Sequence, residues 1–179
     1  GETLRVGTQR GLAVGTLDGL TELLGWPAVR SIVWLSREPG VARVAIGNSV
    51  GRYEDGELSW IEQARRIPKD FGVAHSLFED PEGVLYAGTE TGLWVERDGR
   101  FEREALPGNQ RRPITAFGMC DAGQLWCGSD VALFTLKEGV WRSVVLPEMT
   151  GTAQTRGIAA LPGGGVLCAP HGGGLVVVI

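Results

Sequence analysis

Four polar residues hold matching positions in segments that otherwise consist mostly of small or apolar residues: Arg30, His75, Thr115 and Arg156. The segments Arg30–Ser36, Thr115–Cys120 and Arg156–Leu161 are predicted inner strands of a repeated β-structure. The guanidinium group of arginine matches the oxygens of a carboxylate or phosphate. One hypothesis is therefore an anion-binding ring at a channel mouth, extended by Arg111 and Arg112 of an adjacent loop. The alternative, which the residue types favour, is that these side chains contact only channel water.

A second set of polar residues follows the next predicted strands and is expected at the same end: Asn48, Glu90, Asp130 and His171. Glu90 and Asp130 suggest the carboxylate pair of a glycosidase, whose acid and base lie ~5 to 10 Å apart. A general acid also needs surroundings that raise its pKa. Exposed loops do not provide them, so catalysis is the least favoured hypothesis.

Other catalytic or metal-binding patterns are missing from the sequence. The glycine runs 163–165 and 172–174 follow turns and lack the Lys-Ser/Thr of a phosphate loop. His75 and His171 are too isolated to suggest a metal site, and no cofactor is expected. The three cysteines form no CxxC motif and are predicted to be buried free thiols: Cys120, Cys127 and Cys168.

A repeat of about 40 residues positions all of these side chains. Its clearest copy runs from Val84 to Ala105, and the glycine that ends its first apolar run is Gly88. The counterparts of Gly88 are assigned as Gly7, Gly47, Gly128 and Ala169, at intervals of 40, 41, 40 and 41 residues. Acidic-Gly pairs predict hairpin turns of type I′ at 18–19, 55–56, 98–99 and 138–139. Short strands separated by such turns are typical of four-stranded propeller blades.

The predicted fold is a single all-β domain, a β-propeller of antiparallel blades spanning residues 1–179. Its units are a partial blade at 1–25, full blades at 26–65, 66–106 and 107–147, and a partial blade at 148–179, about five in all. Three interpretations stay open: a small five-bladed ring, an arc completed by another copy or chain, and a segment of a longer propeller. The last two are favoured together, because the apolar C-terminal stretch Leu175–Ile179 is unsuited to solvent.

Composition narrows the class of partner. Acidic residues outnumber basic ones by 21 to 17, so nucleic acid is an unfavoured partner. No apolar run reaches the ~20 residues of a membrane span, and no signal peptide is visible. The compartment is not defined, although unpaired cysteines favour the cytoplasm. Trp26, beside Pro27 in a loop, is the candidate anchor for a protein partner.

The segments LYAGTETGLWVERDGRFE and LWCGSDVALFTLKEGVW resemble the repeats of two-component-regulator-type propellers. The Asp55-Gly56 turn before Trp60 is also similar to Asp-box (BNR-like) blades, but no Asp box is intact, so the resemblance does not imply sialidase chemistry. The resemblance covers essentially the whole chain and implies a sensory or protein-binding module, usually within a longer protein.

Three functions follow, in order of preference. The first is a non-enzymatic module for protein–protein interaction or assembly, with self-association through the terminal blades. The second is a sensor that binds a carbohydrate or small anion at the channel mouth, and the third is a glycosidase-like enzyme.

Overall fold

The computed structural model describes residues 4–8, 11–16, 19–23, 28–60, 67–108, 111–121, 123–144, 154–171 and 174–178. These residues contain strands and turns but no helix, and every strand pairing among them is antiparallel. The all-β class predicted from the sequence is therefore confirmed.

The strands form five sheets, each a simple meander along the chain. The first sheet holds β1 (Leu4–Thr8), β2 (Gly11–Thr16) and β3 (Gly19–Leu23). The second holds β4 (Val29–Trp34), β5 (Val41–Ile46), β6 (Ser49–Glu54) and β7 (Glu57–Trp60). The third holds β8 (Ala74–Glu79), β9 (Leu85–Thr89), β10 (Gly92–Arg97) and β11 (Arg100–Arg103). The fourth holds β12 (Ala116–Met119), β13 (Leu125–Gly128), β14 (Leu133–Lys137) and β15 (Val140–Val144), and the fifth holds β16 (Thr155–Ala160), β17 (Val166–Pro170) and β18 (Val176–Val178).

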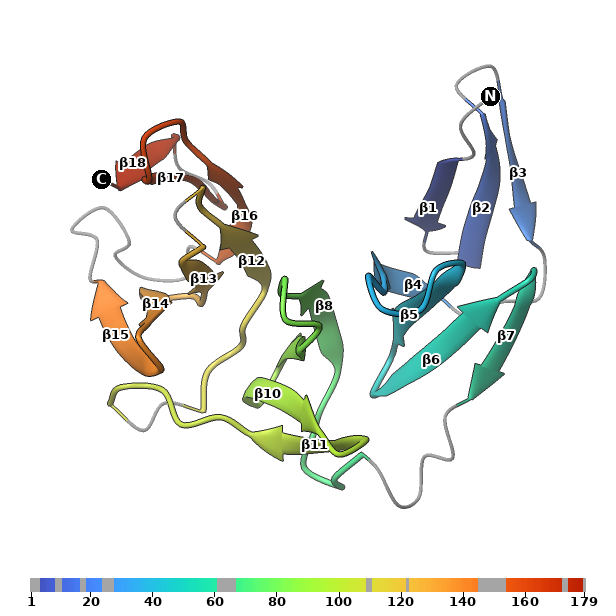
Figure 1. The fold of residues 1–179 in the computed structure, drawn as a ribbon, viewed down its shortest axis with the longest axis horizontal. Helices are drawn as coiled ribbons and strands as arrows, with labels where there is room; N and C mark the ends of the chain where they lie inside the picture. Colours follow the sequence, from blue (N-terminus) through green and yellow to red (C-terminus); the bar gives the residue numbers. More distant parts are fainter. Residues whose placement is uncertain are drawn as a thin grey trace.

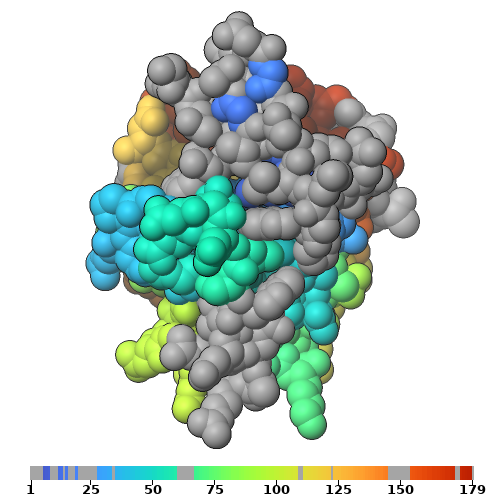
Figure 2. Space-filling model, turned by 90° about the vertical axis from the view of Figure 1, so that its right-hand side faces the viewer, coloured from blue at the N-terminus to red at the C-terminus, as the bar shows by residue number. Residues whose placement is uncertain are grey.

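The sheets are arranged side by side in an arc, as the blades of a β-propeller are (Figure 1). The inner strands β4, β8, β12 and β16 contact one another in succession, and β1 contacts β4. The outer strands β3, β7, β11 and β15 lie on the outside of the arc (Figure 1). Figure 2 views the outer side of the second sheet, where β6 and β7 form part of the surface. The total of about five blades and the blade boundaries stay predictions.

The hairpin turns form where the acidic-Gly pairs predicted them. Asp55 and Gly56 have φ angles of 49° and 89°, and Asp98 and Gly99 have φ angles of 49° and 72°. Glu138 likewise adopts a φ of 54° before Gly139. Positive φ at both central residues is the requirement of a type I′ turn. The fourth predicted turn includes Asp18, which lies outside the described residues.

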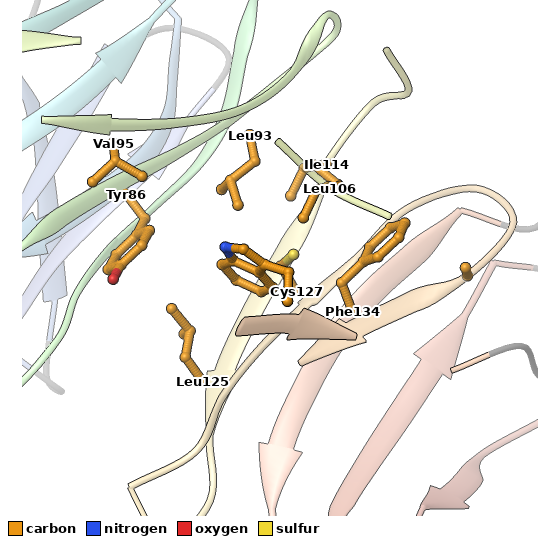
Figure 3. Close-up of a cluster of buried hydrophobic side chains, with 10 residues drawn as sticks. Tyr86, Leu93, Val95, Leu106, Ile114, Leu125, Cys127 and Phe134 are labelled. Carbon is orange, nitrogen blue, oxygen red and sulfur yellow. The ribbon is translucent and has the colours of Figure 1, made fainter. Parts of the chain in front are cut away.

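Apolar side chains fill the space between neighbouring sheets. Between the third and fourth sheets, Tyr86, Leu93 and Val95 approach Leu125 and Phe134 in one buried cluster (Figure 3). Cys127 belongs to this cluster, and all three cysteines are buried free thiols, as predicted. Burial of such surface stabilises the fold by roughly 25 cal/mol per Å². Inter-sheet packing therefore determines how closely the inner strands can approach.

The structure corrects one member of the repeat alignment. Gly88 pairs with Leu93, five residues on, and Gly128 pairs with Leu133 in the same way. In the second sheet the matching pair is Ala45 with Val50, so Ala45 is the counterpart of Gly88. Gly47 is instead a turn residue, with a φ of 57°. The sequence alignment matched Gly47 with Gly88 because both are glycine. Gly47 is needed for its positive φ, whereas Gly88 is needed for a close contact with the next sheet.

Close contact with the next sheet explains the small residue at this position. A Cβ atom on Gly88 would lie 2.5 Å from the carbonyl oxygen of Ile114, two residues before β12. A Cβ atom on Gly128 would lie 2.5 Å from the Cβ of Thr155 on β16. In the second sheet this position is held by Ala45, which shares a buried cluster with the equally small Ala74 of β8. The repeated glycine is thus a packing requirement between sheets.

The predicted ends of the inner strands are wrong in detail. The predicted inner strands are displaced by one or two residues at their ends, as in β12, which begins at Ala116 and not at Thr115. Strand ends depend on hydrogen bonding to the neighbouring strand, which the apolar pattern alone does not define.

Candidate ligand-binding site at the inner-strand bulges

Three of the predicted site residues occupy β-bulges at the same position of three inner strands. In β4, Val29 pairs with Ile46 and Ser31 with Ala45, so Arg30 is the extra residue. The register shifts in the same way around His75 of β8 and around Arg156 of β16. A bulge leaves its extra residue unpaired in the ladder and redirects the side chain. The bulges therefore place Arg30, His75 and Arg156 at one end of the inner strands.

Thr115 holds the corresponding position beside β12, but its groups serve the fold. Its backbone N–H donates to the carbonyl oxygen of Gly128 at 2.9 Å. Its hydroxyl donates to the carbonyl oxygen of Thr155 on the next inner strand. Thr115 therefore links the fourth and fifth sheets, and its hydroxyl hydrogen is already used in a hydrogen bond within the fold.

Electrostatics show that the charges at this end influence one another. His75 is half-buried, and this burial is the largest cause of its lowered pKa. The positive charges of Arg30 and Arg156 lower the pKa of His75 further, whereas the carboxylate of Glu90 raises it. Arg156 belongs to the fifth sheet and His75 to the third, so the curvature of the arc brings residues of separate sheets within electrostatic range.

Both arginines at this end are available to a ligand. Arg30 and Arg156 are exposed, and neither forms an ion pair with a carboxylate among the described residues. Five other described arginines do pair with carboxylates: Arg43, Arg52, Arg97, Arg103 and Arg112. The bulge end, defined here as Arg30, His75, Glu90 and Arg156, therefore carries uncompensated positive charge.

Two of the links that follow the second strands begin beside the inner strands. The backbone N–H of Glu90 donates to the carbonyl oxygen of Val73 at 2.9 Å, and that of His171 donates to Gln154 at 2.7 Å. Asn48 departs from this set, because Gly47 holds the equivalent position. Asn48 instead lines a pocket of about 270 Å³ with a group of mostly apolar neighbours: Ser49, Ile67, Pro68, Lys69, Phe71 and Gly72.

Arg112 forms an ion pair, and Arg111 acts on the charge of Asp70. The Nη1 atom of Arg112 donates to Oδ2 of Asp130 at 3.0 Å. Arg111 is exposed and is a minor cause of the lowered pKa of Asp70, whose main cause is the hydrogen bond from Arg103. The charge of Arg112 is therefore compensated by Asp130, unlike the charges of Arg30 and Arg156.

A structural cluster around Arg103 was not predicted from the sequence. Its guanidinium lies 4.3 Å from the ring centroid of Trp94, and its Nη2 donates to Oδ2 of Asp70 at 2.8 Å. Thr91 completes the cluster by donating its hydroxyl to the backbone carbonyl oxygens of Asp70 and Phe71. These contacts position the link that carries Glu90. No local sequence signal identifies them, because the partners come from three separate segments.

The remaining sequence predictions concern Trp26, metal binding, membrane spans and the cysteines. Trp26 lies outside the described residues. Within the described ranges, no group of three His, Cys, Asp or Glu residues is arranged to hold a metal ion. No helix long and apolar enough to cross a membrane is found in that part of the chain. Burial raises the pKa of Cys168 to about 11, so its thiol is not activated.

Comparison with known proteins identifies the fold. No protein-family model matches the chain, and no curated protein matches its sequence. The extracellular domain of the putative hybrid two component system BT4673 from B. thetaiotaomicron is 18% identical, with a TM-score of 0.82 over 99% of this chain and 25% of that one. The corresponding domain of BT3049 from the same organism is 14% identical, with a TM-score of 0.75 over 99% and 25%. The WD40 β-propeller domain of Doa1 is 12% identical, with a TM-score of 0.74 over 98% and 60%.

These likenesses define the chain as an all-β structure of the propeller class. The chain spans about a quarter of the length of the two sensor domains. At such low identity the likeness concerns the fold, since one fold serves many functions. The resemblance to two-component-regulator propellers is thereby supported at the level of fold, and the resemblance to Asp-box blades stays a prediction.

Proposed function

We propose that the chain is a non-enzymatic β-propeller module of a sensor or interaction protein, and that it recognises its ligand at the bulge end. The observation that carries this proposal is the repeated bulge, which redirects Arg30, His75 and Arg156 to one end of three inner strands. Loops and redirected strand ends on a rigid scaffold are common positions for binding residues.

The comparisons support a sensor or interaction role. Two of the similar structures are described as extracellular domains of putative two component systems, and another is a WD40 propeller. In this proposal, residues 1–179 form one propeller domain or segment with the blade boundaries predicted from the sequence. A longer sensor protein would contain further blades, as the two longer domains suggest.

A steric block at the bulge end tests the site without removing a positive charge. Glu90→Trp adds bulk beside the start of β8, where the backbone of Glu90 contacts Val73, and Glu57→Trp makes the same change on the exposed outer strand β7. Thermal unfolding would be followed with phosphate, succinate, galacturonate, galactose and glucose. We expect at least one compound to stabilise the original protein and Glu57→Trp but not Glu90→Trp. Equal stabilisation of all three proteins would contradict this site.

Self-association through the fifth sheet is the second candidate. Leu175 and Val177 are 68% and 54% exposed, and Val177 belongs to β18, which pairs with β17. Exposed apolar groups on a sheet favour association. Light scattering over a concentration series would detect it, and Val177→Glu should lower the mass whereas Lys137→Glu should not. A concentration-independent monomer would reject this candidate. Trp26 stays a proposed anchor for a protein partner.

A glycosidase is not supported by the geometry around its two candidate carboxylates. Asp130 is paired with Arg112, and Glu90 is exposed. Glu90 therefore lacks the apolar enclosure that a general acid needs at neutral pH, and Asp130 is held by the charge of Arg112. We therefore propose that the chain binds a ligand, and we do not propose that it hydrolyses a glycoside.

A further inference from the structure

We infer that the bulge end binds a small monoanionic carboxylate that also bears hydroxyl groups. This inference rests on the proposed function and names the class of ligand for the same site. Arg30 and Arg156 would hold the carboxylate, and His75 and Glu90 would hydrogen-bond the hydroxyl groups. Each assignment follows from the chemistry of the side chain and its surroundings.

The two arginines are the source of anion preference. The protein carries a net charge of −4, yet Arg30 and Arg156 are exposed without a carboxylate partner among the described residues. Both occupy the bulge of an inner strand, at the same position as His75, whose ionisation both influence. Their positive charges would attract a carboxylate to this end of the strands. Guanidinium forks bind carboxylates through two parallel hydrogen bonds, which adds geometric selectivity.

The neighbouring groups argue against a ligand of higher charge. Glu90 adds one negative charge to this end, where its backbone N–H donates to the carbonyl oxygen of Val73, just before β8. With a neutral His75, the bulge end therefore has one net positive charge, which a single carboxylate balances. A neutral imidazole offers one donor and one acceptor, and the Glu90 carboxylate accepts hydrogen bonds only. Hydroxyl groups on the ligand match both residues, whereas a second carboxylate would face Glu90.

Galacturonate and galactose form a matched pair of probes, because they differ only in the carboxylate. Isothermal titration calorimetry would compare the original protein with Arg30→Gln/Arg156→Gln. The control is Arg100→Gln/Arg142→Gln, which makes the same charge change on two exposed arginines of the outer strands β11 and β15. All four residues are at the surface, where substitutions rarely unfold a protein. Circular dichroism would confirm that both variants remain folded.

We expect galacturonate to bind the original protein and the control at least about tenfold more tightly than it binds Arg30→Gln/Arg156→Gln. Galactose should bind the original protein at least about tenfold more weakly than galacturonate. Added salt should weaken galacturonate binding, since the site is exposed.

Three outcomes would overturn the inference. Equal binding of galactose and galacturonate, both blocked by Glu90→Trp, would reject the anionic ligand while the proposed function stands. Tight binding of inorganic phosphate in place of galacturonate would reject the hydroxylated carboxylate. Equal galacturonate binding by both double variants, or no binding at all, would reject the role of the two arginines. Equal binding by Glu90→Trp in addition would also reject the proposed site.

Discussion

Substitution of Gly128 by alanine tests the packing argument most directly. The added Cβ would lie 2.5 Å from Cβ, 2.6 Å from Cγ2 and 2.7 Å from Oγ1 of Thr155. Thr155 is 1% exposed, and its hydroxyl donates to the carbonyl oxygen of Ser129 at 3.1 Å. The side chain therefore cannot rotate away without losing a buried hydrogen bond, and β16 must move away from β13. Overpacking of this kind costs about 1–3 kcal/mol.

Urea unfolding would measure this cost, with Gly157→Ala as the matched control. Gly157 also lies on β16, but a Cβ there would meet nothing within 4 Å. We expect Gly157→Ala to change the free energy of unfolding by less than about 1 kcal/mol, in either direction. Equal effects of Gly128→Ala and Gly157→Ala would refute the reasoning.

A double variant separates the clash from a general effect of alanine. Gly128→Ala/Thr155→Ala recreates the pair that the second sheet has in Ala45 and Ala74, both of which are fully buried. The two changes should be non-additive by about 1 kcal/mol, because the second relieves part of the clash made by the first. Additive effects would show that Thr155 does not limit the space beside Gly128.

Two further predictions concern side-chain environments. Burial, aided by the charges of Arg30 and Arg156, lowers the pKa of His75 below its ordinary value of 6.5, so the unfolded chain takes up this proton first. Its contribution to stability is therefore present above pH 6.5 and lost as the pH falls below that value. The urea midpoint should fall less in His75→Gln than in the original protein between about pH 7.5 and pH 5, and an equal fall would contradict this role. Arg103→Lys should cost about 0.5–1 kcal/mol from the lost contact with Trp94, measured by the tryptophan fluorescence of urea unfolding, and an unchanged midpoint would argue against the contact.

The all-β propeller architecture was predictable from the sequence because its signals are local. The Asp-Gly pairs at 55–56 and 98–99 specify type I′ turns through their own φ preferences, and those turns form. The interval of about 40 residues then indicates the number of strands in each repeat. Arg30, His75 and Arg156 were also identified, because each interrupts an apolar segment at the same point.

Tertiary structure alone decided how these elements fit together. The choice of Ala45 over Gly47 as the counterpart of Gly88 depends on the next inner strand, which limits space only after the sheets have packed. Likewise, a hydrogen bond to the fifth sheet uses the hydroxyl of Thr115, and an ion pair with Asp130 compensates Arg112, whereas Arg30 and Arg156 have no such partner among the described residues. The sequence determined which side chains reach one end of the repeats. Packing between sheets, which joins residues about 40 positions apart, decided which of them are available to a ligand.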